Sequence, residues 1–293
     1  MAKFKSKNPH FEFLRKRWTG RQAVSSQNLL DKHLRHITLG SLGGLALLSS
    51  ANISSPSGTV NNQTIGMDSE FSVASSNNRL LATELIDKLP RESRNLTDTE
   101  NDRVISLIQK DLGVKVKSEI DGIRLNRTIG LIGGEQHLYR YPGDTIFEHA
   151  KDSADWAMYS SAGVAPGLGA WGYFAPSKSK FTAQDQERER YYIAVQTFLA
   201  PGFAENVSKY RDFFKYRKML VVNPKTGQSV VTDIGDAGPG ESTGKHLGGS
   251  PEVMHHLGLG GGPRKGEVLY YFIDDSNANI PLGPLEIKQE VSL

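Results

Sequence analysis

The chain has no cysteine among its 293 residues. Disulfide bonds, thiolate metal sites and the cysteine-linked lipid anchor of many bacterial envelope proteins are therefore excluded. The sequence also has no phosphate-binding loop, HExxH pair, GxSxG elbow or dinucleotide-binding fingerprint in a suitable context. We expect no cofactor, and the adjacent His255 and His256 do not form a metal site, because neighbouring helical residues point about 100° apart.

Charge is distributed unevenly along the chain. The whole sequence carries a net +3, but residues 1–36 hold nine basic and two acidic residues, a net of +7. The remainder holds 26 basic and 30 acidic residues, a net of −4. A mildly acidic body argues against nucleic acid as a partner.

The basic arm, residues 1–36, is followed by an apolar segment, residues 37–53. A basic stretch before a short apolar run is typical of an export signal or membrane anchor whose basic side stays in the cytoplasm. Ser49 and Ala51 fit a cleavage site, whereas the long arm fits an uncleaved anchor, so both remain open. Residues 54–79 are rich in Ser, Asn and Gly and predict a flexible linker. We therefore expect a membrane contact through residues 37–53 and an extracytoplasmic body.

Residues 80–157 predict a small α+β region. Apolar residues recur at helical spacing in residues 80–89 and again in residues 97–112. Thr97 and Glu100 have the spacing of a capping box, and Gly113 is expected to end the second helix. Residues 125–141 are rich in β-formers around two glycines, which predicts a hairpin that turns at Gly133 and Gly134.

The most informative segment is residues 221–239, in which a hairpin runs into a glycine-punctuated acidic loop. Asn-Pro-Lys-Thr-Gly at 223–227 is turn chemistry, because proline presets one backbone angle and glycine accepts a positive φ. The β-branched residues on both sides suit paired strands. Asp236 then lies between Gly235 and Gly238, and residues 266–274 predict a closing strand.

This segment resembles a known family. The hairpin, Gly-Asp-Ala-Gly-Pro at 235–239, Ser-Pro-Glu-Val-Met at 250–254 and Leu-Gly-Leu at 257–259 resemble the double-psi β-barrel of rare lipoprotein A-like cell-wall proteins and expansins. Residues 193–202 resemble the preceding strand of that family, and residues 163–174 loosely resemble its opening strand. The resemblance implies a mainly β fold, a double-psi β-barrel at residues 158–293, with the small α+β region before it.

The resemblance implies that the partner is peptidoglycan or another envelope glycan. Lytic transglycosylase-like cleavage of this glycan is one activity that the resemblance implies. The lytic members have a histidine on the earlier strand and an aspartate in Asp-Leu-Ser. This chain has Val195 or Gln196 at the first position and His246 near the second, whereas Asp236 keeps its family identity. The alternative is therefore a catalytically silent interaction module on the same barrel.

Two roles are open for Asp236. A raised pKa would make it a general acid for glycan cleavage. Alternatively, it caps its own loop by accepting backbone N–H bonds, which lowers its pKa. His246 is the second candidate for catalysis. The remaining candidates are charged or aromatic side chains expected to bind substrate: Asp233, Glu241, Lys245, Trp171 and Tyr173.

Overall fold

The computed structural model describes residues 67–92, 94–261, 264–275 and 279–285, with side chains from residue 78 onward. The expected basic arm and the apolar segment 37–53 lie outside the described residues. Within the described ranges, no helix is both long and apolar enough to cross a bilayer. Helix α2 begins at Met67, inside the segment that was expected to be a linker.

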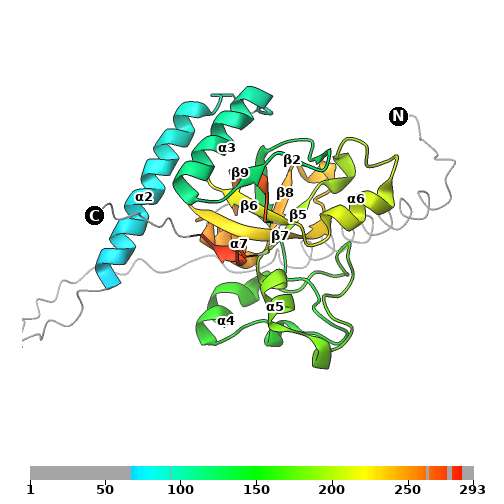
Figure 1. Cartoon of the computed structure of the whole chain (residues 1–293). Helices are drawn as coiled ribbons and strands as arrows, with labels where there is room; N and C mark the ends of the chain where they lie inside the picture. The colour runs from blue at the N-terminus through cyan, green and yellow to red at the C-terminus, as the bar shows by residue number, and fades with distance from the viewer. Residues whose placement is uncertain (1–66, 93, 262–263, 276–278, 286–293) are drawn as a thin grey trace, which may run out of the picture. The chain divides into compact units, whose positions relative to one another are not determined.

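Six strands close into a barrel in the order β9, β4, β8, β5, β7, β6 and back to β9. The pairs β4/β8 and β5/β7 are parallel, and the other neighbouring pairs are antiparallel. This closed mixed barrel with attached helices confirms the predicted mainly β fold (Figure 1). The barrel strands are β4 (Ile129–Gly134), β5 (Tyr192–Val195), β6 (Lys218–Val222), β7 (Ser229–Ala237), β8 (Leu247–Gly249) and β9 (Lys265–Ile273).

Short strands and helices surround the barrel. Strand β1 extends the sheet beside β9, β10 pairs with β7, and β2 and β3 form a separate hairpin. These strands are β1 (Val116–Lys117), β2 (Glu119–Ile120), β3 (Ile123–Arg124) and β10 (Gly283–Pro284). The α-helices are α2 (Met67–Lys88), α3 (Asp98–Leu112), α4 (Ser153–Tyr159), α5 (Ala183–Arg190), α6 (Val207–Phe214) and α7 (Pro251–His256). The 3-10 helices are η1 (Ile146–Glu148), η2 (Ser160–Ala162), η3 (Lys178–Lys180), η4 (Thr197–Leu199) and η5 (Glu241–Thr243).

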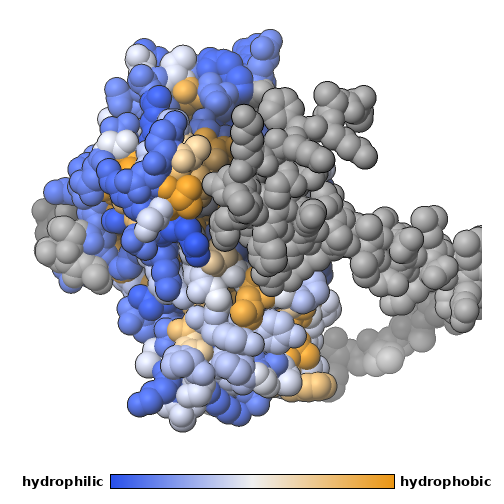
Figure 2. Space-filling view, turned by 90° about the vertical axis from the view of Figure 1, so that its right-hand side faces the viewer, coloured by the Kyte–Doolittle hydropathy of each residue, from blue (hydrophilic) through white to orange (hydrophobic). Residues whose placement is uncertain are grey.

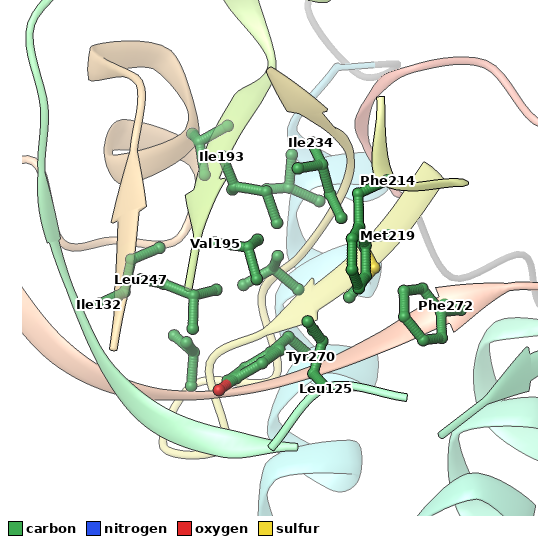
Figure 3. Close-up of a cluster of buried hydrophobic side chains, with 14 of the residues drawn as sticks. Leu125, Ile132, Ile193, Val195, Phe214, Met219, Ile234, Leu247, Tyr270 and Phe272 are labelled. Carbon is green, nitrogen blue, oxygen red and sulfur yellow. The ribbon is translucent and has the colours of Figure 1, made fainter. Parts of the chain in front are cut away.

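The barrel is filled by apolar side chains from its own strands, joined by others such as Leu125 and Phe214 of α6, and these side chains point toward one another in Figure 3. Successive residues of a strand point to opposite faces, so Met219 and Val221 of β6 face the interior, whereas Leu220 and Val222 face outward. The outward residues are also buried, under α2 and α3. Burial on both faces explains why β6 is a continuous apolar run rather than an alternating one.

Helices α2 and α3 lie side by side and cover one side of the barrel (Figure 1). The predicted capping box of α3 is confirmed: Glu100 N donates to Thr97 Oγ1 (3.3 Å), and Thr97 N donates to Glu100 Oε2 (2.8 Å). Gly113 ends the helix with a φ of 65°, as expected for a C-cap glycine. On the face shown in Figure 2, hydrophilic residues dominate and apolar residues form small separate groups.

The β6–β7 hairpin is confirmed, with Val222 opposite Ser229 and the predicted turn between them. The hairpin expected at Gly133 and Gly134 is not present. Strand β4 instead runs through both glycines between β8 and β9. The physical reason is a close approach of side chains, because a Cβ at Gly133 would lie 2.4 Å from Lys245 Cδ. Strand β4 comes from the segment 80–157, so the barrel draws on residues before the expected boundary at 158.

Candidate functional site

A row of small residues crosses the outer face of four adjacent barrel strands. Asp236 of β7 lies opposite Ala194 of β5. Ala194 lies opposite Gly248 of β8, and Gly248 lies opposite Gly133 of β4. Their strand neighbours, including Ile132, Ile193, Val195 and Leu247, fill the inner core. Since strand residues alternate in direction, Ala194, Gly248 and Gly133 face outward, and we call these three with Asp236 the outer row.

Two charged side chains lie over the glycines of the outer row. Lys245 Nζ is 2.5 Å from Glu135 Oε1, and both side chains are partly buried. A Cβ at Gly248 would lie 2.3 Å from Glu135 Cγ, so this packing depends on glycine. Glycine within a strand often marks a place where another group approaches the backbone closely. Here the approaching group is the Lys245–Glu135 ion pair, which covers the buried Gly133 and Gly248.

Asp236 lies at one end of the outer row. Its Oδ1 accepts hydrogen bonds from Ala170 N (2.6 Å) and Ala237 N (2.7 Å). Burial raises the pKa of Asp236; the two amide bonds lower it, the charge of Glu135 raises it, and the net shift is upward. Both amides bond the same oxygen, and Oδ2 accepts no hydrogen bond from the described residues. The backbone bonds of the capping interpretation are therefore present, but they do not lower the pKa of Asp236 below its ordinary value.

The structure brings Lys245 and the loop of Trp171 to the outer row. Trp171 Nε1 donates to Ile234 O (2.9 Å), and the preceding residue, Ala170, holds Asp236. Tyr173, two residues further, is 38% exposed. The glycine-dense loop is therefore joined to the hairpin through Ala170 and Trp171, whereas Tyr173 is an exposed residue of the same loop.

His246, Asp233 and Glu241 lie elsewhere. His246 Nδ1 accepts from Leu131 N (2.9 Å), and its Nε2 is 2.7 Å from Arg127 Nη1. Burial lowers the pKa of His246, and the charge of Arg127 lowers it further. Asp233 is fully buried, and Glu241 begins η5 in an exposed position. Neither His246 nor these two carboxylates joins Asp236 on the outer row.

A second group of functional side chains is buried and was not predicted. Glu189 Oε1 accepts from Leu138 N (3.1 Å) and lies 3.2 Å from His137 Nδ1. The other oxygen, Oε2, is 3.3 Å from His149 Nδ1. His149 Nε2 lies 2.9 Å from Asp144 Oδ2. Since these residues are only 1–4% exposed, the group forms a continuous polar network inside the protein.

The charges of this network stabilise one another. Arg140 holds Asp144 through its Nη2 (2.7 Å) and Nε (3.0 Å). Burial opposes the charge of Asp144, but the bonds from His149 and Arg140 keep its pKa well below the ordinary value. Burial also opposes the charges of Glu189 and His149. The two histidines nevertheless lower the pKa of Glu189 to about 2, and the carboxylates of Asp144 and Glu189 raise that of His149 to about 9.

A small cavity of about 10 Å³ adjoins the network and is lined by His137, His149 and Glu252 among others. Glu252 of α7 is 1% exposed, and its Oε1 lies 3.5 Å from Arg190 Nη1. Burial raises the pKa of Glu252 to about 7, and the charge of Glu189 raises it further. Four atoms of the residues that line this cavity are buried and have no hydrogen-bond partner within the described ranges: His137 Nε2, His149 Nδ1, Arg190 Nε and Glu252 Oε2. No local spacing in the sequence marks this group, because His137 and Glu189 are 52 residues apart.

Comparison with protein-family models, with curated proteins and with solved structures finds no match to this chain. The functional interpretation therefore depends on the two groups themselves. The outer row joins a buried floor, formed by Gly133, Ala194 and Gly248, to the partly exposed Asp236. The buried network is suited only to something as small as a water molecule or an ion.

Proposed function

We propose that the chain is a cell-envelope protein that binds peptidoglycan or a related glycan along the outer row of a double-psi β-barrel. The observation that carries the proposal is the position of Asp236. This aspartate, which keeps the identity expected from the resemblance, ends a row of small residues that carries the Lys245–Glu135 ion pair.

The chemistry of the outer row matches that of a glycan with attached peptides. Carboxylate oxygens of Asp236 and Glu135 accept hydrogen bonds from sugar hydroxyls. The Lys245 ammonium suits the carboxylates of peptide stems, and a floor of glycine and alanine lets a flat sugar ring approach the backbone. These are few, directional polar groups beside an apolar surface, as ligand sites require.

The double-psi topology is supported by two features of the barrel. It is closed by six strands with two parallel pairs, β4/β8 and β5/β7. The Asp-x-Gly-Pro segment that carries the family resemblance lies at the end of β7 and in the residues that follow it.

Cleavage is the second candidate function, and the raised pKa of Asp236 favours it. A general acid must hold its proton near the working pH, which an ordinary aspartate does not do. Two observations favour binding alone: Asp236 accepts two backbone amides, and His246 bonds Arg127 and Leu131 instead of facing it. Binding is therefore the function that the geometry supports best.

The test is sedimentation of the purified full chain with insoluble peptidoglycan, with cellulose as a control polymer. We expect the chain to sediment with peptidoglycan and to stay in solution with cellulose. A chain that stays in solution with both would contradict the proposal. Release of soluble muropeptides, measured in parallel for the wild type and Asp236→Asn, decides cleavage: release that Asp236→Asn abolishes supports it, and no release by the wild type leaves binding alone.

A further inference from the structure

The buried network contains three groups arranged as ligands of a single ion. One nitrogen or oxygen atom from each of His137, His149 and Glu189 lies within 4.8 Å of the others. The side chains come from three separate parts of the chain: the segment after β4, the residue after η1, and helix α5. We propose that these three side chains bind one divalent metal ion, with Zn²⁺ as the best match to two imidazoles and a carboxylate.

The distance between His149 Nδ1 and Glu189 Oε2 suits two ligands of one metal ion better than it suits a hydrogen bond between them. His149 Nδ1 is 3.3 Å from Glu189 Oε2, yet this nitrogen has no partner with hydrogen-bond geometry within the described ranges. Two atoms that each bind a tetrahedral zinc at about 2.0–2.2 Å are themselves separated by about 3.3–3.6 Å. The pair is therefore already at the separation that a shared ion requires.

The surroundings of His149 match those of a metal-binding histidine. Its other ring nitrogen, Nε2, lies 2.9 Å from Asp144 Oδ2, and Arg140 fixes that carboxylate from the opposite side. Histidine ligands almost always donate their second ring N–H to a carboxylate or carbonyl, which fixes the tautomer and turns the free nitrogen toward the metal. Asp144 would thus be a positioning residue that leaves Nδ1 for the ion.

A fourth position is available at the cavity. His137 Nε2 and Glu252 Oε2 are both buried and lack hydrogen-bond partners among the described residues. Both residues line the cavity of about 10 Å³, which is the space needed for one water molecule or ion. Three buried carboxylates, on Asp144, Glu189 and Glu252, lie in this network with Arg140, Arg190 and the imidazole of His149.

The proposed metal site and the outer row share no residues, and we expect them to have different roles. The metal site uses no side chain that is proposed to bind glycan. Because the ligands come from separate segments, a bound ion would join the chain between β4 and α4 to helix α5. Metal bound only by the folded state stabilises that state by mass action. The expected role is therefore structural, and it does not depend on the proposed glycan binding.

The test uses the purified full chain after treatment with a chelator. Zn²⁺ is titrated in competition with a chromophoric chelator, and the thermal unfolding midpoint is followed with and without the ion. We expect one Zn²⁺ per chain and a higher midpoint. His137→Gln and Glu189→Gln should remove the high-affinity site, whereas Asp144→Asn should weaken it about 10- to 100-fold. His255→Gln removes an exposed histidine and should bind as the wild type does.

Absence of stoichiometric Zn²⁺ binding to the wild type would overturn the proposal. Binding that is equal in the wild type and His137→Gln would also overturn it, since the ion would then be held elsewhere. If a variant fails to fold, the unfolding midpoint of the wild type still tests the proposal. An unchanged midpoint at saturating Zn²⁺ would contradict the proposed metal site, and a raised midpoint would support it.

Discussion

The amide of Ala170 donates a 2.6 Å hydrogen bond to Oδ1 of Asp236, across 66 residues of sequence. This bond joins the glycine-dense loop to the hairpin through one oxygen of the carboxylate. Ala237 N bonds the same oxygen at 2.7 Å. The aspartate is consequently a structural anchor and a candidate ligand group at once, and substitutions are able to separate the two roles.

Asp236→Asn and Asp236→Ala should differ in stability. Asparagine keeps an oxygen that accepts from Ala170 and Ala237, so we expect its free energy of unfolding to stay close to that of the wild type. Alanine leaves both amides without this acceptor and should cost about 1–3 kcal/mol. Denaturant titration of the two variants measures the difference. Equal stabilities would show that the anchor contributes nothing.

Asp233 should lower stability at neutral pH. The carboxylate is fully buried, has no hydrogen-bond partner in the described part of the chain, and lies 3.8 Å from Arg188 Nε. Burial raises its pKa well above the ordinary value, although the charges of Arg188 and Lys218 oppose the shift. The folded state therefore holds the proton more tightly, and stability falls as pH rises above about 4, the unfolded value.

Asp233→Asn removes this penalty, so the variant should be more stable than the wild type at pH 7, by about 1–3 kcal/mol. The difference should shrink as the pH is lowered toward 4 and reach its minimum below 4, where the wild-type carboxyl group is neutral in both states. Asp212→Asn is the matched control, because Asp212 is exposed. A difference that does not change with pH would contradict the titration argument. Unfolding free energies at several pH values provide the measurement.

Gly227 in the β6–β7 turn should resist substitution more than Gly244 does. Both have a positive φ, 75° and 67°, so alanine strains the backbone equally. Only at Gly227 would the new Cβ collide with another segment, at 1.9 Å from the backbone oxygen of Asn78 in α2. Gly227→Ala should therefore lower the unfolding midpoint clearly more than Gly244→Ala. Similar midpoints would mean that α2 does not pack on this turn.

Gly248→Ala should weaken glycan binding while the fold persists. Its Cβ would lie 2.3 Å from Glu135 Cγ, which is a flexible side chain that moves aside. The methyl group and the displaced carboxylate then occupy the outer row. Gly261→Ala is the control, since nothing lies within 4 Å of the built Cβ there. Circular dichroism checks the fold, and peptidoglycan sedimentation measures binding; equal binding by the two variants would remove Gly248 from the site.

Local signals in the sequence were sufficient for several elements. The capping box and C-cap glycine of α3 and the turn of the β6–β7 hairpin are each encoded within a few residues, so spacing predicts them. Gly133 and Gly134 misled the prediction for the opposite reason. Gly133, which is typical of a turn, instead leaves room for the side chain of Lys245. This contact joins residues that are far apart in the sequence, so no local pattern predicts it.

The buried network illustrates the same limit for the functional residues. Residues 182–190 are so highly charged that they suggest a solvated surface, yet Glu189 and Arg190 are 1% and 6% exposed. Their burial depends on partners such as His149 and Asp155, which lie far away in the sequence. Asp236 was found because a motif marks it. Glu189 carries no such mark, and only the assembled fold shows its role.

The most direct test of the account is the affinity of the full chain for insoluble peptidoglycan, measured by sedimentation for the wild type, Asp236→Asn and Glu241→Gln. Both substitutions remove one negative charge, but Glu241 is exposed and lies off the outer row. The account predicts that Asp236→Asn weakens binding about tenfold or more, as expected for the loss of a charged hydrogen-bonding group, and that Glu241→Gln binds as the wild type does. Equal affinities for all three proteins, or no binding by the wild type, would contradict it.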